Sequence, residues 1–195
     1  MLNIETCPLN SGVYVSRLRI PKAHPFVRSL CAKAEVRLRN AMTAEEYGQE
    51  VAQFLKDHDI LYLATSRDDD PRCTPLGYFT RGLTVYVLSE GGGKFANLAR
   101  NGKVAYSIAS RVNGGRGLMR VRGLQVWGRA EVVSMRKKRK RFEEILQFTG
   151  IMESLGKRGM KGLPSFHYRF IIVEPEKIRY LNLGKGINNI TWTRS

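Results

Sequence analysis

Residues 83–108 constrain the fold more than any other stretch of this sequence. An apolar segment at 83–89 is followed by three glycines at 91–93, a short helix-forming segment at 94–100 and a second apolar segment at 103–108. Apolar runs of this length bounded by turn residues indicate strands, and the polar segment between them indicates a helix. The stretch therefore predicts a strand, a glycine loop, a short helix and a second strand.

The glycine loop has the chemistry of a phosphate-binding site. Gly91, Gly92 and Gly93 allow positive φ angles and expose backbone N–H groups. They lead into a helix N-terminus, where unpaired N–H donors favour an anion. Lys94 adds a positive charge and Ser89 a hydroxyl. The spacing matches neither a Walker loop nor a Rossmann loop, so a flexible connection with a solvated lysine is the alternative.

The net charge of the chain indicates that its binding partners are negatively charged. The 195 residues include 33 Lys and Arg against 17 Asp and Glu, which gives a net charge of +16. Such a balance favours phosphate-bearing ligands, polyanions or an acidic membrane surface. A hydrophobic content of 43% is typical of a globular protein, and the length suits one domain with an extension.

The cellular compartment and the expected lack of a metal site are inferred from the absence of certain sequence signals. It has no apolar run long enough to span a bilayer and no secretory leader. Its three cysteines, Cys7, Cys31 and Cys73, form no CxxC pair, and its three histidines are scattered. We therefore expect a cytoplasmic protein with reduced thiols, no metal site, and a buried structural role for Cys73.

The N-terminal part divides at about residue 42. Residues 1–42 are expected to form an extension or arm, with a strand within 12–20 and a short basic helix at 29–39, and residues 43–195 are expected to form the main domain. Thr43 and Glu46 make a capping box. The helix that they open, to about Asp57, places one apolar stripe against the core, made of Tyr47, Val51, Phe54 and Leu55.

The main domain contains predominantly strands. We expect strands at 60–66, buried on both faces, then at 72–80, 83–89, 103–110 and 118–133, the first three forming a meander. Gly123 and Gly128 suggest bulges in the long strand. A last hairpin is expected from 166–173 and 177–183 around a turn at 174–176. With no βαβ rhythm, these six or seven strands predict an antiparallel β-barrel of the mainly β (α+β) class with flanking helices.

A basic helix is expected at 135–149, followed by a connection at 150–164. Its run RKKRKR at 136–141 suggests either nucleic-acid binding or a solvated helix face. The other face is needed for packing, so we expect a solvated face and only non-specific, salt-sensitive association with nucleic acid.

Three local patterns in this order resemble the pyridoxamine 5′-phosphate oxidase-like family of flavin-binding split barrels. They are LYLATSRDDDPRCTPLGYF at 61–79, VLSEGGGKFANLARNGKVAYSI at 87–108 and LQVWGRAEVV at 124–133. The resemblance covers about residues 46–183. It implies a split barrel that binds FMN as a homodimer, with the flavin at the subunit interface.

The resemblance also implies which residues bind the cofactor. Lys94 and Ser89 would contact the FMN phosphate, Gly93 would line the same loop, and the segment from Thr74 to Gly77 would run beside the isoalloxazine and the ribityl chain. The full expected set is Thr74, Pro75, Leu76, Gly77, Leu88, Ser89, Gly93, Lys94 and Gln125. Gln125 enters because Gly123 occupies the position of the family's glutamine, and Gln125 lies two residues on, on the same strand face.

Two departures affect the expected activity. Thr74 stands where the oxidases that name the family have arginine, and Phe79 where they have lysine. A broader FMN-dependent oxidoreductase acting on an unidentified small molecule therefore fits better than a vitamin B6 oxidase. Alternatives are a non-catalytic binding protein for FMN, haem or another anionic cofactor, and a flavin-binding regulator that touches nucleic acid. No catalytic residue is evident in the sequence. Three aromatic residues on expected strands, Tyr78, Tyr106 and Trp127, could stack on a cofactor ring, but we expect ordinary packing within the barrel for each of them.

Overall fold

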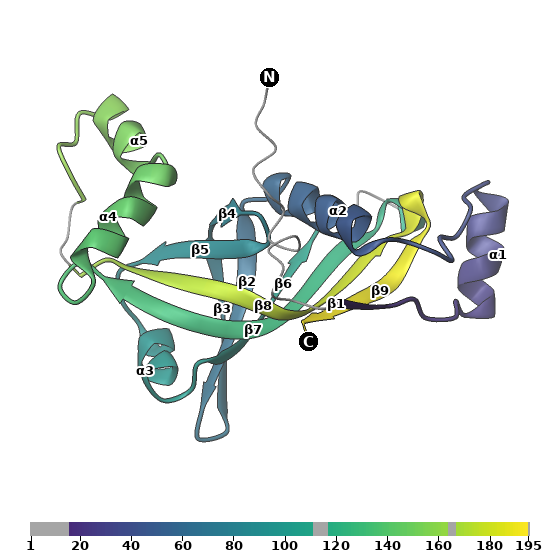
Figure 1. Ribbon diagram of the computed structural model, residues 1–195, viewed down its shortest axis with the longest axis horizontal. Coiled ribbons are helices and arrows are strands. Elements are labelled where there is room, and N and C mark those ends of the chain that lie inside the picture. The colour runs from purple at the N-terminus through teal and green to yellow at the C-terminus, as the bar shows by residue number, and fades with distance from the viewer. Residues whose placement is uncertain (1–15, 111–116, 164–166, 195) are drawn as a thin grey trace.

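The computed structural model describes residues 16–110, 117–163 and 167–194 of the chain, and Figure 1 shows how their elements are arranged. The strands in this part are β1 (Ser16–Arg19), β2 (Ile60–Arg67), β3 (Asp70–Gly77), β4 (Phe79–Arg81), β5 (Thr84–Ser89), β6 (Lys103–Ala109), β7 (Arg122–Ser134), β8 (Arg169–Asn182) and β9 (Ile187–Arg194). The helices are α1 (Pro25–Lys33), α2 (Ala44–Lys56), α3 (Gly93–Arg100), α4 (Arg139–Phe148) and α5 (Ile151–Lys157), with 3₁₀ turns η1 (Leu118–Arg120) and η2 (Leu183–Lys185).

The strands form one antiparallel sheet in the order β1-β9-β8-β7-β6-β2-β3, and β5 joins it by pairing with β8 and β4. Among the described residues, β1 and β3 do not pair with each other, so the barrel stays open. This unclosed antiparallel sheet with flanking helices confirms the predicted fold class. The described residues form nine strands rather than six or seven. The expected strand at 72–80 breaks at Tyr78 into β3 and β4, and β1 and β9 are additional, whereas the two strands expected at 166–173 and 177–183 are the single strand β8.

The barrel splits along β8, where a hairpin was expected. β8 is one strand of 14 residues, and it pairs with β7 along its whole length. On its other edge, Arg169 to Val173 pair with β5, whereas Lys177 to Asn182 pair with β9. The partner changes at Pro175, which has no N–H to donate to a ladder. The hairpin prediction was wrong because Pro175 is accommodated at this gap rather than in a turn.

A bulge lies at that gap. Between the pairs Trp127–Lys177 and Gly128–Pro175, β8 has one residue more than β7, Glu176. The bulge therefore belongs to β8 and faces Gly128, whereas the glycines had suggested a bulge in the long strand itself. A Cβ atom at Gly128 would lie 2.1 Å from the Glu174 carbonyl oxygen, closer than any real contact. The close approach of β7 to β8 therefore requires glycine at this position.

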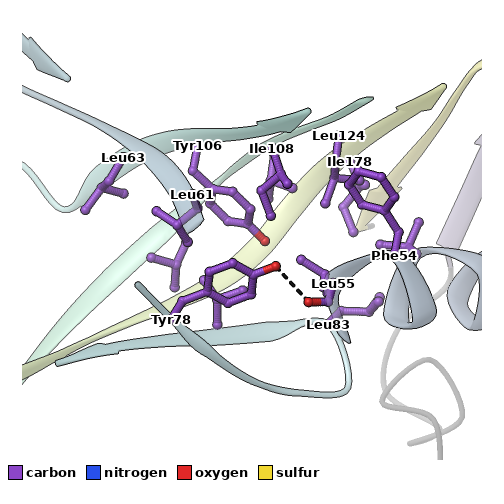
Figure 2. Packing of buried hydrophobic residues seen from close by; sticks show 14 of the residues in the cluster. Phe54, Leu55, Leu61, Leu63, Tyr78, Leu83, Tyr106, Ile108, Leu124 and Ile178 are labelled. Carbon is purple, nitrogen blue, oxygen red and sulfur yellow. Dashed lines mark hydrogen bonds between the residues drawn. The ribbon is translucent and has the colours of Figure 1, made fainter. Parts of the chain in front are cut away.

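The main core lies between the sheet and α2. α2 begins at the predicted capping box, since the Glu46 N–H donates to the Thr43 hydroxyl and the Glu46 carboxylate accepts from the Thr43 N–H. The predicted stripe of α2 is buried. Figure 2 shows Phe54 and Leu55 facing Leu124 and other side chains of the sheet.

Two tyrosines reach into this core. The Tyr78 hydroxyl donates to the Leu55 carbonyl oxygen at 2.7 Å (Figure 2). The Tyr106 hydroxyl is buried, and no described residue forms a hydrogen bond with it. Burial raises the pKa of both phenols. Both side chains belong to the core, as the packing interpretation predicted.

A second, smaller core lies beneath α4. Phe142 and Leu146 of α4 pack against Phe170 and Val133 of the sheet. The expected helix at 135–149 begins only at Arg139, because residues 135–137 form a turn after Ser134. The expected connection at 150–164 contains a further helix, α5, which begins after the left-handed Gly150.

The segment before the main domain also joins the sheet. β1 pairs with β9, from Ser16 opposite Arg194 to Arg19 opposite Thr191, so part of the expected strand at 12–20 is present and the rest lies outside the described residues. The helix expected at 29–39 instead starts at Pro25, which suits the first helical position. Whether residues 1–42 act as a separate arm stays a prediction.

Of two expectations for the central strands, one holds in part and one was wrong. β2 pairs with β3, and β4 pairs with β5, as a meander requires, but the break at Tyr78 leaves β3 and β5 unpaired with each other. β2 is not buried on both faces, because Ile60 and Tyr62 are each 49% exposed. An apolar run does not distinguish a doubly buried strand from one whose outer face carries exposed apolar side chains.

Candidate functional site

The glycine loop and α3 form the site that the sequence singled out. Gly92 caps α3 with a φ of 101°, a conformation that favours glycine. The helix is fixed on β2, since the Asn97 side chain donates to the Thr65 hydroxyl at 3.2 Å. The Asn101 side chain, at the other end of α3, donates to the Ser66 carbonyl oxygen. The N–H groups at the start of α3 are therefore held in a defined position beside the end of β5.

Three cationic side chains surround this loop. Lys94 is 7% exposed, and its Nζ donates to the Gly91 carbonyl oxygen. The Arg72 guanidinium covers Gly93, where an added Cβ atom would lie 2.9 Å from Cζ. The Arg169 Cζ lies 4.6 Å from the centroid of the Phe95 ring, in the first turn of α3. We call Arg72, Lys94 and Arg169 the cradle cations.

The charges of the cradle cations are not balanced by carboxylates. In the described ranges, none of the three forms an ion pair. Burial, and then the nearby Arg72 charge, lower the pKa of Lys94 below its ordinary value. A buried, unpaired ammonium is costly, and an anion at the loop would reduce that cost. The cradle therefore has the electrostatics of an anion-binding site.

The structure brings three of the predicted site residues together at the cradle. Ser89 ends β5 directly opposite Arg169 on β8, and Gly93 and Lys94 begin α3. Leu88, the neighbour of Ser89, packs its side chain against the second core instead. Only its backbone could therefore serve a ligand at the loop.

The predicted segment on β3 divides between two faces. Thr74 and Leu76 lie two and four residues after Arg72, on the same face of the strand, and both are half-buried. Pro75 and Gly77 lie on the opposite face and are exposed. One strand therefore joins the cradle to the outer face of the sheet.

Gln125 lies on that outer face, in a second pocket. The pocket has a volume of about 240 Å³ and is lined mainly by Tyr62, Cys73, Ser107, Gln125 and Trp127. None of the cradle residues lines it. Trp127 is 37% exposed here, so core packing does not account for its side chain. Cys73 is exposed as well, and its predicted burial was wrong because it points away from the core.

Sequence reasoning missed Arg72 and Arg169. Arg72 has a weak local signal, since it lies two residues before Thr74 and a strand places such residues on one face. Arg169 has none, because only the pairing of β5 with β8 places it opposite Ser89.

No helix in the described part of the chain is long and apolar enough to cross a bilayer.

Comparison with known proteins gives a family match and several similar folds. A family model described as pyridoxamine 5′-phosphate oxidase matches residues 47–182. No curated protein matches the chain. A proposed pyridoxamine 5′-phosphate oxidase from Listeria innocua is 23% identical, with a TM-score of 0.55, over 70% of this chain and 99% of that one.

Two further structures share the fold at lower identity. A protein from Clostridium acetobutylicum, related to general stress protein 26, is 16% identical with a TM-score of 0.56, over 77% of this chain and 96% of its own. A heme binding protein from Mycobacterium smegmatis is 12% identical with a TM-score of 0.56, over 81% of this chain and 60% of its own. At these identities the likeness concerns the fold.

Proposed function

This chain belongs to the pyridoxamine 5′-phosphate oxidase family, and on that premise we propose that it is a flavoprotein that binds FMN. The observation that carries the proposal is the cradle, where a buried lysine, which pairs with no carboxylate of the described residues, meets two arginines and a helix N-terminus. A phosphate monoester carries up to two negative charges and three acceptor oxygens. It would balance the charge of the cradle and accept hydrogen bonds from the loop.

The cradle fits a phosphate in shape as well as in charge. Gly91 has open space around it, and Gly93 leaves room only for the Arg72 guanidinium. Backbone N–H groups and a bidentate guanidinium are typical phosphate ligands. Lys94, Arg72 and Arg169 would hold the phosphate, with the Ser89 hydroxyl as an additional donor.

The isoalloxazine is proposed to lie along β3, beside the segment from Thr74 to Gly77. When bound, the flavin would supply the redox chemistry, and the protein would bind, orient and shield it. The described residues suggest no acid–base pair for a catalytic role. We therefore propose an FMN-dependent oxidoreductase of an unidentified small molecule, without assigning a catalytic residue.

We also propose that the active form is a homodimer with the flavin at the interface. The outer face of β2 and β7 exposes large side chains, Ile60, Tyr62 and Trp127, that a monomer would leave in water. Such a patch is typical of a surface that another protein covers. In this arrangement Gln125, which lies on that face, would reach a flavin at the interface rather than the cradle of its own chain.

A non-catalytic binder of haem or another anionic cofactor is the second candidate. The cradle cations suit haem propionates as well as phosphate, and a heme binding protein shares the fold. Two described histidines are engaged elsewhere: His24 accepts from the Phe26 N–H as the N-cap of α1, and a ring nitrogen of His58 lies 2.8 Å from the Phe54 carbonyl oxygen. Neither histidine lines the pocket at Gln125, and this position, rather than the hydrogen bonds, favours FMN over a haem ligated there by either of them.

Specific nucleic-acid binding by the basic run at 136–141 is not proposed. Lys138 and Arg141 both pair with Glu131, and Arg139 pairs with Glu143. These ion pairs reduce the charge that the run offers to a polyanion. They agree with the prediction of a solvated, charged surface.

The test is the visible absorption spectrum of the purified protein, followed by FMN titration of the wild type and of Lys94→Ala. We expect the wild type to show a flavin spectrum or to take up FMN. Lys94→Ala should weaken FMN binding at least about tenfold, because a charge-assisted phosphate contact is lost. Lys103→Ala is the control: Lys103 is an exposed lysine on β6, so this variant should bind FMN normally. A colourless protein that ignores FMN would contradict the proposal, and a haem spectrum would support the second candidate.

A further inference from the structure

A basic groove lies at the end of the sheet opposite the cradle. Its volume is about 550 Å³, and it is bounded by β8 and β9 on one side and by the segment from β1 to α1 on the other. Figure 1 shows α1 and β9 at one end of the molecule and α3 at the other. Four cationic side chains line the groove, Arg19, Lys22, Lys177 and Arg179, and we call it the distal groove.

Strand register places three of these cations around two threonines. Arg19 and Arg179 both lie directly opposite Thr191, from the two strands that flank β9. Lys177 lies opposite Thr193 in the same way. Directly opposed residues of antiparallel strands share a face, and the two arginines are one intervening strand apart, about 10 Å between backbones. Long arginine side chains can therefore meet over Thr191.

Among the described residues, the distal groove has no counter-charge. None of them contributes a carboxylate to its lining, and none of its four cations forms an ion pair with another of them. The other lining side chains include neutral donors, Asn188 and Asn189 as well as the threonines. A concave surface with one sign of charge concentrates its potential, so this groove attracts multiply charged anions.

We propose that the distal groove binds a small molecule through its phosphate groups, at a site separate from the cradle. Two guanidinium groups on either side of Thr191 suit phosphate oxygens, which they can bind in pairs. Four cations exceed what a single carboxylate would balance and suit a diphosphate. The volume lies within the usual range of small-molecule sites, about 300–1,000 Å³. The proposal does not depend on FMN binding at the cradle.

The groove has a natural reporter. The Lys177 Nζ lies 4.8 Å from the centroid of the Trp127 ring, so an anion that draws Lys177 away changes the environment of that indole. The sequence has two tryptophans, and the other, Trp192, is 2% exposed in the core. Tryptophan fluorescence therefore follows the groove, and Trp127→Phe should abolish the response.

The experiment is a fluorescence titration of the full chain with adenosine 5′-diphosphate and with pyrophosphate, with adenosine as the uncharged comparison. We expect saturable responses to the two phosphate compounds and none to adenosine. Arg19→Gln combined with Arg179→Gln should weaken both affinities at least about tenfold. Both arginines are exposed, so the variant should fold, which its thermal melt verifies. Arg136→Gln combined with Lys137→Gln removes the same charge elsewhere and should leave binding intact.

Three results would overturn the proposal. Equal weakening in the two double variants would mean that only net charge matters. Loss of the response in Lys94→Ala, with the groove variant unaffected, would assign the response to the cradle. Saturable binding of a single-stranded oligonucleotide without binding of either phosphate compound would identify the groove as a nucleic-acid surface.

Discussion

Replacing Gly93 by alanine tests how the glycine loop and Arg72 act together. A Cβ atom at Gly93 would lie 2.9 Å from both Cζ and Nε of Arg72, which is too close for the guanidinium to stay. Arginine is flexible, so the side chain should move away and the backbone should remain. The residue is the first of α3, and alanine forms helices better than glycine by about 0.5–1 kcal/mol. We expect Gly93→Ala to leave the protein as stable as the wild type, or more so, and to weaken FMN binding.

The size of the loss follows from the contact that is removed. A hydrogen bond to a charged group contributes about 1.5–3 kcal/mol, and the exposure of Arg72 places the expected loss near the lower end. About 1.4 kcal/mol corresponds to a tenfold weaker Kd. FMN titration by flavin fluorescence measures it directly. Gly91→Ala is the matched control, because nothing lies within 4 Å of a Cβ atom there.

A double-mutant cycle decides whether the effect passes through Arg72. If it does, Gly93→Ala should weaken FMN binding about tenfold in the wild type and hardly at all when Arg72→Ala is already present. Fully additive losses would refute the reasoning. So would a loss in Gly91→Ala as large as that in Gly93→Ala, since the loop would then act through its flexibility alone.

Three further predictions concern the core, the bulge and the cradle. Tyr106→Phe should leave the free energy of unfolding unchanged or raise it, since no described residue forms a hydrogen bond with its hydroxyl, whereas Tyr78→Phe should lower it by about 1 kcal/mol; equal effects in urea unfolding would contradict the assignment. Gly128→Ala should destabilise by about 3 kcal/mol or more, because the Glu174 carbonyl at 2.1 Å is backbone and cannot yield, and an unchanged denaturation midpoint would refute the clash. Because the pKa of Lys94 is lowered in the ligand-free protein, FMN affinity should begin to fall at a pH below 10.5, and Lys94→Ala should lack this transition. Without ligand, the free energy of unfolding should rise between that lowered pKa and 10.5, since the charged lysine is the form that burial disfavours.

Local signals in the sequence predicted several elements correctly. The Thr43 capping box and the apolar stripe after it define α2, and the glycine loop before Lys94 defines the start of α3. Such signals succeed because caps and helical periodicity depend on residues within one or two turns of each other. Gly128 also indicated an irregularity between strands, since a missing side chain shows where strands approach closely, although the extra residue of the bulge belongs to β8 rather than to the strand that carries Gly128.

Errors arose where a strand's partner decided the outcome. Pro175 resembles a turn residue in sequence, yet it lies inside β8 because the edge of that strand changes from β5 to β9 there. Ile60 and Tyr62 resemble core residues, yet they face outward. Pairing partners and the second layer of a sheet are not encoded in neighbouring residues, so propensity alone could not assign them.

The sequence by itself determined the class of this protein, an antiparallel barrel with a glycine loop and a lysine at a helix start. Only the tertiary structure decided which charges surround that loop and which gather elsewhere. Arg72 and Arg169 are 97 positions apart by residue number, and Arg19 and Arg179 are 160 apart. Strand register brings the first pair to α3 and the second pair to either side of Thr191. Long-range pairing is set by the energy of the whole sheet, which no local pattern expresses.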